Sequence, residues 1–133
     1  QRADIGAGRY GVLADEITLS EFNNRVKTGL GVNHLQFVGD PTRTVRRVAM
    51  ACGAAAEFLR DGHRLGCDVL LTGEARFHDC LEARHLGMAL VLPGHYASER
   101  PAMERLAETL SSQFQELFVS ASQIESDPLK WDI

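Results

Sequence analysis

Residues 68 to 95 read DVLLTGEARFHDCLEARHLGMALVLPGH, and this stretch decides the fold. It begins with a short apolar run at Asp68–Thr72, continues with apolar residues at helical spacing over Phe77–Leu86, and ends with a second apolar run over Met88–Leu92. Short continuous apolar runs are typical of strands that are covered on both faces. The stretch therefore predicts a strand, a helix and a second strand, joined by a right-handed crossover in a parallel sheet.

The sequence before this stretch adds elements of both kinds. Thr18 stands three residues before Glu21, which is a capping-box arrangement and predicts a helix over Leu19–Leu30. Further strands are predicted over His34–Val38 and Val45–Cys52, and a further helix over Ala54–Leu65. Strands that alternate with helices favour an α/β fold class, with a mostly parallel or mixed sheet flanked by helices.

The two ends of the chain carry weaker patterns. Residues 1–17 are rich in glycine and predict a linker loop or a short extended segment, which leaves residues 18–133 as the α/β domain. Pro101 suits the first turn of a last helix, with Ser98 as its N-cap. Glu116–Ala121 predicts a final strand.

Composition excludes several classes of protein. The 133 residues include 14 Lys plus Arg against 18 Asp plus Glu, and no apolar stretch approaches the roughly 20 residues of a membrane-spanning helix. The chain has no leader-like start and no basic cluster, so we expect a cytoplasmic protein with neither membrane nor nucleic acid as partner. Cys52, Cys67 and Cys80 form no Cys-x-x-Cys pair, which argues against a disulfide framework or a thiolate zinc site.

The candidate ligands follow the last predicted strand. In open α/β sheets, ligands bind outside the carboxyl ends of the strands. There the segment GHYASE places the imidazole of His95 in a turn and the carboxylate of Glu99 at the start of a helix. These two groups can bind one hard or borderline cation, so His95 and Glu99 are candidate metal ligands. In a simpler interpretation, Ser98 caps the helix and the helix dipole stabilises Glu99.

A second polar cluster follows the neighbouring strand. Thr72, Glu74 and His78 are candidates to support the metal ligands or to face a substrate. His78 also shares one side of its helix with Glu82 and His85, at the spacing of helix-borne metal ligands. The apolar residues on the opposite side favour a solvated polar face instead. The sequence contains no nucleophile elbow and no Walker loop.

Together these motifs resemble a known family. The segments TGE (72–74), FHD (77–79) and GHYASE (94–99) occur in order, between GRYG (8–11) near the start and Asp127-Pro128 near the end. The set resembles the carboxyl-terminal half of the GTP cyclohydrolase I type 2 family, the Nif-three-like dinuclear-metal proteins. The resemblance covers nearly the whole chain.

The resemblance implies a two-domain α/β protein with two divalent metal ions, Zn, Mn or Fe, between its halves. It implies a homohexameric ring and metal-activated water that attacks a nucleotide or a related small-molecule substrate. His95 and Glu99 would be two of the ligands, and the others come from first-half motifs that are absent here. The family's Gly-Ser-Gly-type loop reads Gly53-Ala54-Ala55. We therefore expect this portion alone to bind metal poorly and to be inactive.

Two alternatives stay open at this point. The chain could belong to a ring-forming regulatory or scaffold protein whose metal site is structural or vestigial. It could also be a nucleotide-binding α/β domain that needs no metal.

Overall fold

The protein forms a mixed sheet with helices on both faces, which confirms the predicted fold class. The computed structural model describes residues 6–132, and in them the strand order is β1-β3-β4-β5-β2. The three central strands are parallel and the two edge strands are antiparallel to their neighbours. The central strands are β3 (Thr44–Ala51), β4 (Val69–Thr72) and β5 (Ala89–Leu92), and the edge strands are β1 (Arg9–Thr18) and β2 (Gln36–Val38).

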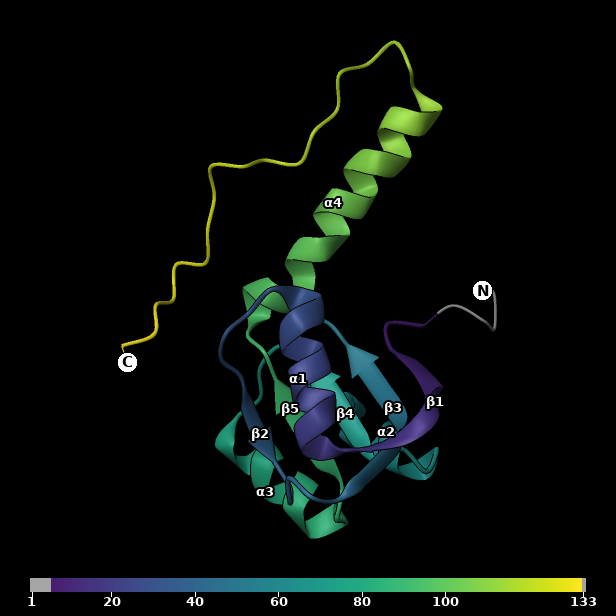
Figure 1. The fold of residues 1–133 in the computed structure, drawn as a ribbon, viewed down its shortest axis with the longest axis vertical. Helices are drawn as coiled ribbons and strands as arrows, with labels where there is room; N and C mark the ends of the chain where they lie inside the picture. The colour runs from purple at the N-terminus through teal and green to yellow at the C-terminus, as the bar shows by residue number, and fades with distance from the viewer. Residues whose placement is uncertain (1–5, 133) are drawn as a thin grey trace.

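Two apolar clusters lie on opposite faces of the sheet. Helix α1 (Leu19–Leu30) covers one face, and the short 3-10 helix η1 (Ala56–Phe58), α2 (Leu59–Arg64) and α3 (Phe77–Leu86) cover the other (Figure 1). On β4, Val69 packs in the α1 cluster and Leu70 in the other, and both are fully buried. Because both faces are covered, the central strands are apolar without alternation.

The capping box predicted for α1 is present. The Thr18 hydroxyl accepts a hydrogen bond from the Glu21 N–H at 3.2 Å, and the Glu21 carboxylate accepts one from the Thr18 N–H at 2.7 Å. These bonds from the Thr18 backbone and side chain lower the pKa of Glu21. The contribution of Glu21 to folding is therefore present above its ordinary pKa and lost as the pH falls through the lowered one.

Replacing Thr18 with alanine should destabilise the protein by about 1 kcal/mol at neutral pH, because the helix loses its N-cap acceptor. Urea denaturation followed by circular dichroism measures the change. Thr28→Ala, an exposed threonine later in the same helix, is the control and should leave stability nearly unchanged. Equal effects of the two substitutions would show that the cap contributes nothing.

Strand β1 (Arg9–Thr18) lies almost wholly within residues 1–17, where the sequence predicted a linker loop or short extended segment. β1 pairs with β3, with an irregularity between Val12 and Ile17, so these residues belong to the sheet. Most β1 side chains are exposed, and an edge strand of this kind carries no alternating apolar pattern. The part of that prediction on residues 1–5 lies outside the described residues.

Three further predictions need correction. The expected helix over Ala54–Leu65 is a 3-10 turn followed by the short α2, and residues 116–121 form no strand. The last helix, α4 (His95–Gln113), starts six residues before Pro101, which therefore lies inside it. Only two residues separate β5 from α4, so the helix begins directly at the sheet edge, with Gly94 rather than Ser98 at the N-cap. Among residues 6–132 we find no helix with the length and apolar character that a bilayer span requires.

Candidate metal centre

The carboxyl ends of the three parallel strands meet at one edge of the sheet, and a glycine-containing turn follows each strand. The Gly73 N–H donates to the Gly53 carbonyl at 2.8 Å, and the Gly94 N–H donates to the Gly73 carbonyl at 2.9 Å. The turns after β3, β4 and β5 are thus bonded side by side. Helix α4 begins directly after the last of these turns.

His95, the first residue of α4, lies between two carboxylates. Its Nδ1 is 2.8 Å from Oε1 of Glu74, and its Nε2 is 3.2 Å from Oε1 of Glu99 one helical turn later. An ionised carboxylate only accepts hydrogen bonds, so Nδ1–H donates to Glu74. In the neutral imidazole, Nε2 then carries the lone pair, on the side of Glu99. Metal-binding histidines are typically oriented by a carboxylate in this way.

The two carboxylates also shape the charge of the site. The hydrogen bond to Glu74 raises the pKa of His95, against a smaller effect of desolvation, and the charge of Glu99 adds to the rise. The imidazole and both carboxylates are about half exposed, so water and ions can reach them. A cation bound near Nε2 would take the place of the proton that this nitrogen otherwise gains. The cation would then balance the negative charge of the two carboxylates.

Gly53 leaves the space that this pair of side chains occupies. Its φ is +69°, and a Cβ atom there would lie 2.6 Å from Oε1 of Glu99 and 3.2 Å from Nε2 of His95. The Gly53-Ala54-Ala55 loop thus has glycine at the position next to both candidate ligands.

Thr72 and Ser98 hold this loop in place. Thr72 is buried, and its hydroxyl donates to the Gly53 carbonyl at 3.0 Å and accepts from the Ala55 N–H at 3.2 Å. The Ser98 hydroxyl accepts from the Gly53 N–H at 2.9 Å and donates to the His95 carbonyl at 2.8 Å. Thr72 therefore supports the loop, and a substrate-facing role of Thr72 stays a prediction. The sequence assigned Ser98 to a helix cap and did not predict this contact, because the helix start was misplaced.

His78 is not brought to this cluster. It is exposed on α3, its ring lies edge-on to that of Phe77 with centroids 6.0 Å apart, and no hydrogen bond or ion pair joins it to another described residue. The structure thus brings His95, Glu99 and Glu74 together and leaves His78 apart. A substrate-facing role of His78 stays a prediction.

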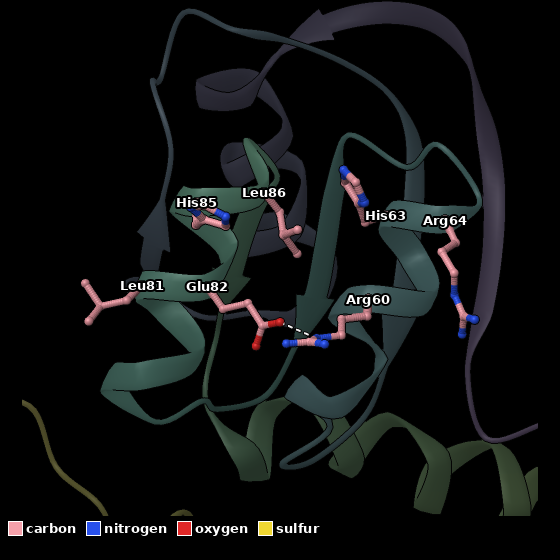
Figure 2. A pocket seen from close by; sticks show the side chains of 7 residues that line it. All are labelled: Arg60, His63, Arg64, Leu81, Glu82, His85 and Leu86. Carbon is pink, nitrogen blue, oxygen red and sulfur yellow. Dashed lines mark hydrogen bonds and ion pairs between the residues drawn. The ribbon is translucent and has the colours of Figure 1, made fainter.

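The polar side of α3 lines a separate hollow between α2 and α3 (Figure 2). His63 and His85 line it, while Glu82 reaches across to form an ion pair with Arg60. Because Glu82 is paired with a cation, this side of α3 is a polar face, as the favoured interpretation has it. The apolar residues Phe77 and Leu81, expected on the packed side, are themselves exposed. Nowhere in residues 6–132 do three or more His, Cys, Asp or Glu side chains form a group arranged to hold a metal ion.

The residues at the sheet edge nevertheless fit a divalent ion as part of a larger ligand set. An imidazole nitrogen and a carboxylate oxygen converge there, and in their deprotonated forms these groups are ligands of Zn²⁺, Mn²⁺ and Fe²⁺. Glu74 lies on the opposite nitrogen, where it can orient the ring but not share the ion. The described residues thus offer two ligands and one orienting carboxylate.

Comparison with known proteins identifies the family of the chain. A sequence model described as Duf34/NIF3 (NGG1p interacting factor 3) matches residues 2–128. The chain belongs to the Duf34/NIF3 family. A Bacillus subtilis relative named GTP cyclohydrolase 1 type 2 homolog is 40% identical over 110 residues, covering 83% of this chain and 29% of the relative. A Clostridium perfringens protein of the same name is 29% identical over 111 residues, which cover 84% of this chain and 42% of the relative.

Solved structures of the Duf34/NIF3 type share the fold. A Bacillus cereus protein related to NIF3 superimposes with a TM-score of 0.82 and 30% identity, over 96% of this chain and 36% of that one. A Staphylococcus aureus protein gives a TM-score of 0.86 with 28% identity, over 94% of this chain and 42% of that protein. The chain spans less than half the length of these relatives.

Proposed function

We propose that this chain contributes part of a divalent-metal site of a hydrolase, in which His95 and Glu99 are ligands. The single observation that carries the proposal is the imidazole held between two carboxylates, with Nδ1 on Glu74 and Nε2 turned toward Glu99. The family's name among its relatives, GTP cyclohydrolase 1 type 2 homolog, adds a nucleotide as the expected class of substrate.

A bound divalent ion would supply Lewis acidity toward water and substrate oxygen. The residues of this chain have other tasks. Glu74 fixes the tautomer of His95 by accepting the Nδ1 proton, and Gly53 keeps the space beside Nε2 free of a side chain. Ser98 couples the Gly53 loop to the first turn of α4, so that the ligands and the loop keep one geometry.

The proposal includes a weak site on the chain by itself. A two-metal hydrolytic site holds its ions about 3.5–4 Å apart, which takes more than one imidazole and one carboxylate. The additional ligands and the assembly into a homohexamer belong to the proposal for the whole protein. There, two ions of Zn, Mn or Fe per site would be bound.

The test compares two isosteric substitutions on α4. Glu99→Gln should weaken Zn²⁺ or Mn²⁺ binding to the chain at least tenfold in calorimetric titration, because the site loses an anionic ligand. Glu108→Gln removes the same charge from an exposed position of the same helix and should change nothing. Equal affinities of the Glu99→Gln variant and the wild type would contradict the proposal.

Turnover separates the hydrolase from the alternative of a scaffold protein. In a protein that includes the remaining ligands, metal-dependent hydrolysis of GTP or a simple phosphoester that Glu99→Gln abolishes supports the enzyme. Absence of turnover, combined with a melting temperature that bound metal raises and Glu99→Gln lowers, supports a structural metal.

A further inference from the structure

The segment that follows α4 runs back toward the sheet edge (Figure 1). Arg100, on the second turn of α4, anchors it: Nη2 donates to the Ser122 carbonyl at 2.6 Å and Nη1 contacts Oε1 of Glu125 at 3.0 Å. The Tyr96 hydroxyl donates to the Glu125 carbonyl at 3.4 Å. The Arg100 side chain is only 17% exposed, so this anchor is partly shielded from water. The tail is therefore held beside the first turns of the helix that carries His95.

The tail and the Glu74 side of the candidate metal centre line one pocket of about 300 Å³, whose lining includes His95 but not Glu99. This volume lies at the lower end of the range of small-molecule sites. One part of its lining comes from the site itself, namely Gly73, Glu74, Gly94 and His95. Another part comes from the tail, namely Asp127, Leu129, Lys130 and Trp131. A molecule bound in this pocket would touch the orienting carboxylate, the ligand imidazole and the tail together.

Trp131 gives the pocket an aromatic surface. Its ring lies 5.6 Å from that of His34, tilted by 46°, and the residue is still 56% exposed. One ring therefore contacts the indole while much of its surface stays open. An exposed indole is suited to stack with a planar ring.

Asp127 gives the same pocket a fixed carboxylate. Its Oδ1 accepts the Leu129 N–H at 2.9 Å, and its own carbonyl accepts from Nζ of Lys130 at 2.7 Å. These bonds hold the turn that places Asp127 and Trp131 in one lining. A carboxylate accepts paired N–H donors, and among the purine bases guanine offers such a pair at N1 and the exocyclic amine.

We propose that the segment Asp127–Trp131 is the base-recognition wall of the site, with Trp131 stacked on a guanine ring and Asp127 accepting its N–H donors. This inference rests on the proposed function in that it takes a nucleotide as the substrate. Guanine is the base of the nucleotide in the relatives' name, and the inference adds the residues of this chain that would select it. Lys130 contributes positive charge at the same wall, which suits an anionic nucleotide.

Trp131 is the only tryptophan of the chain, so its fluorescence reports directly on this wall. With EDTA present to remove metal, GMP should quench the emission saturably, and AMP should bind at least tenfold more weakly. Ribose 5-phosphate, which lacks a base, should not quench. N-acetyltryptophanamide at the same nucleotide concentrations corrects for light absorption. Absence of saturable quenching by GMP, or equal quenching by GMP and AMP, overturns the inference.

Substitution of the carboxylate tests the same point independently. Asp127→Asn retains an oxygen that can accept the Leu129 N–H, yet it should weaken GMP binding at least tenfold, because an amide N–H faces the donors of the base. Glu116→Gln, an exposed charge on the tail outside the pocket lining, is the control and should bind GMP as the wild type does. Circular dichroism checks that both variants fold. Wild-type affinity in Asp127→Asn would contradict the inference.

The metal-free condition separates this inference from the proposed function. GMP binding without any affinity for Zn²⁺ or Mn²⁺ would support guanine recognition by Asp127–Trp131 and refute the metal site. Metal binding through His95 and Glu99 without GMP quenching would support the metal site and refute guanine recognition by Asp127–Trp131.

Discussion

Alanine in place of His95 should lower the affinity of the chain for Zn²⁺ or Mn²⁺ by at least about a hundredfold. Loss of a residue that merely orients a ligand costs about 10–100-fold in metal affinity, and His95 is placed as the ligand itself. Its Nε2 is also the only imidazole nitrogen that faces Glu99 among the described residues. Competition with a chromogenic chelator measures the change.

His85→Ala is the matched control for this substitution. His85 is an exposed histidine that lines the hollow between α2 and α3 (Figure 2), away from the sheet edge. Its removal should leave the affinity unchanged. If both variants lose metal equally, the chain binds ions through scattered surface histidines and the assignment of His95 is wrong.

Gly53→Ala should disrupt the same site, because Gly53 lies in the turn after β3, next to Glu99 and His95. The new Cβ would lie 2.6 Å from Oε1 of Glu99, so the carboxylate or the loop must move. The positive φ of +69° adds about 1–2 kcal/mol of backbone strain. We expect at least a tenfold loss of metal affinity together with a lower melting temperature, measured by calorimetric titration and thermal denaturation.

Gly31→Ala separates strain from contact. Gly31 has a φ of +66° at the end of α1, and nothing lies within 4 Å of its potential Cβ. This variant should share the loss of stability but bind metal normally. Normal metal affinity in Gly53→Ala as well would mean that the loop does not define the site.

The sequence predicts the centre of the fold well because burial there dominates. The helix over Phe77–Leu86 has the predicted bounds, and so does that over Leu19–Leu30, where the capping box marks the start. The central strands are predicted within one residue at each end, because covering both faces of the sheet requires continuous apolar runs.

The errors lie where local signals compete with tertiary contacts. Pro101 predicted a helix start because proline is favoured there, but the short turn after β5 starts the helix at His95. The sequence did not predict β1 as a strand of the sheet, because its side chains are mostly exposed and only its pairing with β3 defines it.

The candidate site was predictable in part. His95 and Glu99 carry their own motif, and Glu74 follows a neighbouring strand end, so the topology brings all three to one edge. The approach of Gly53 to Glu99 depends on loop geometry, and the return of Trp131 to the pocket beside Glu74 and His95 depends on the Arg100 anchor. Neither leaves a pattern in the residues themselves.

Anomalous diffraction from crystals of the chain soaked in Zn²⁺ tests the central claim most directly. We predict an anomalous peak within about 2.0–2.2 Å of both Nε2 of His95 and a carboxylate oxygen of Glu99, with Nδ1 still bonded to Glu74. A peak at the Nδ1 side, at the histidines between α2 and α3, or at neither of the two proposed ligands would contradict the account.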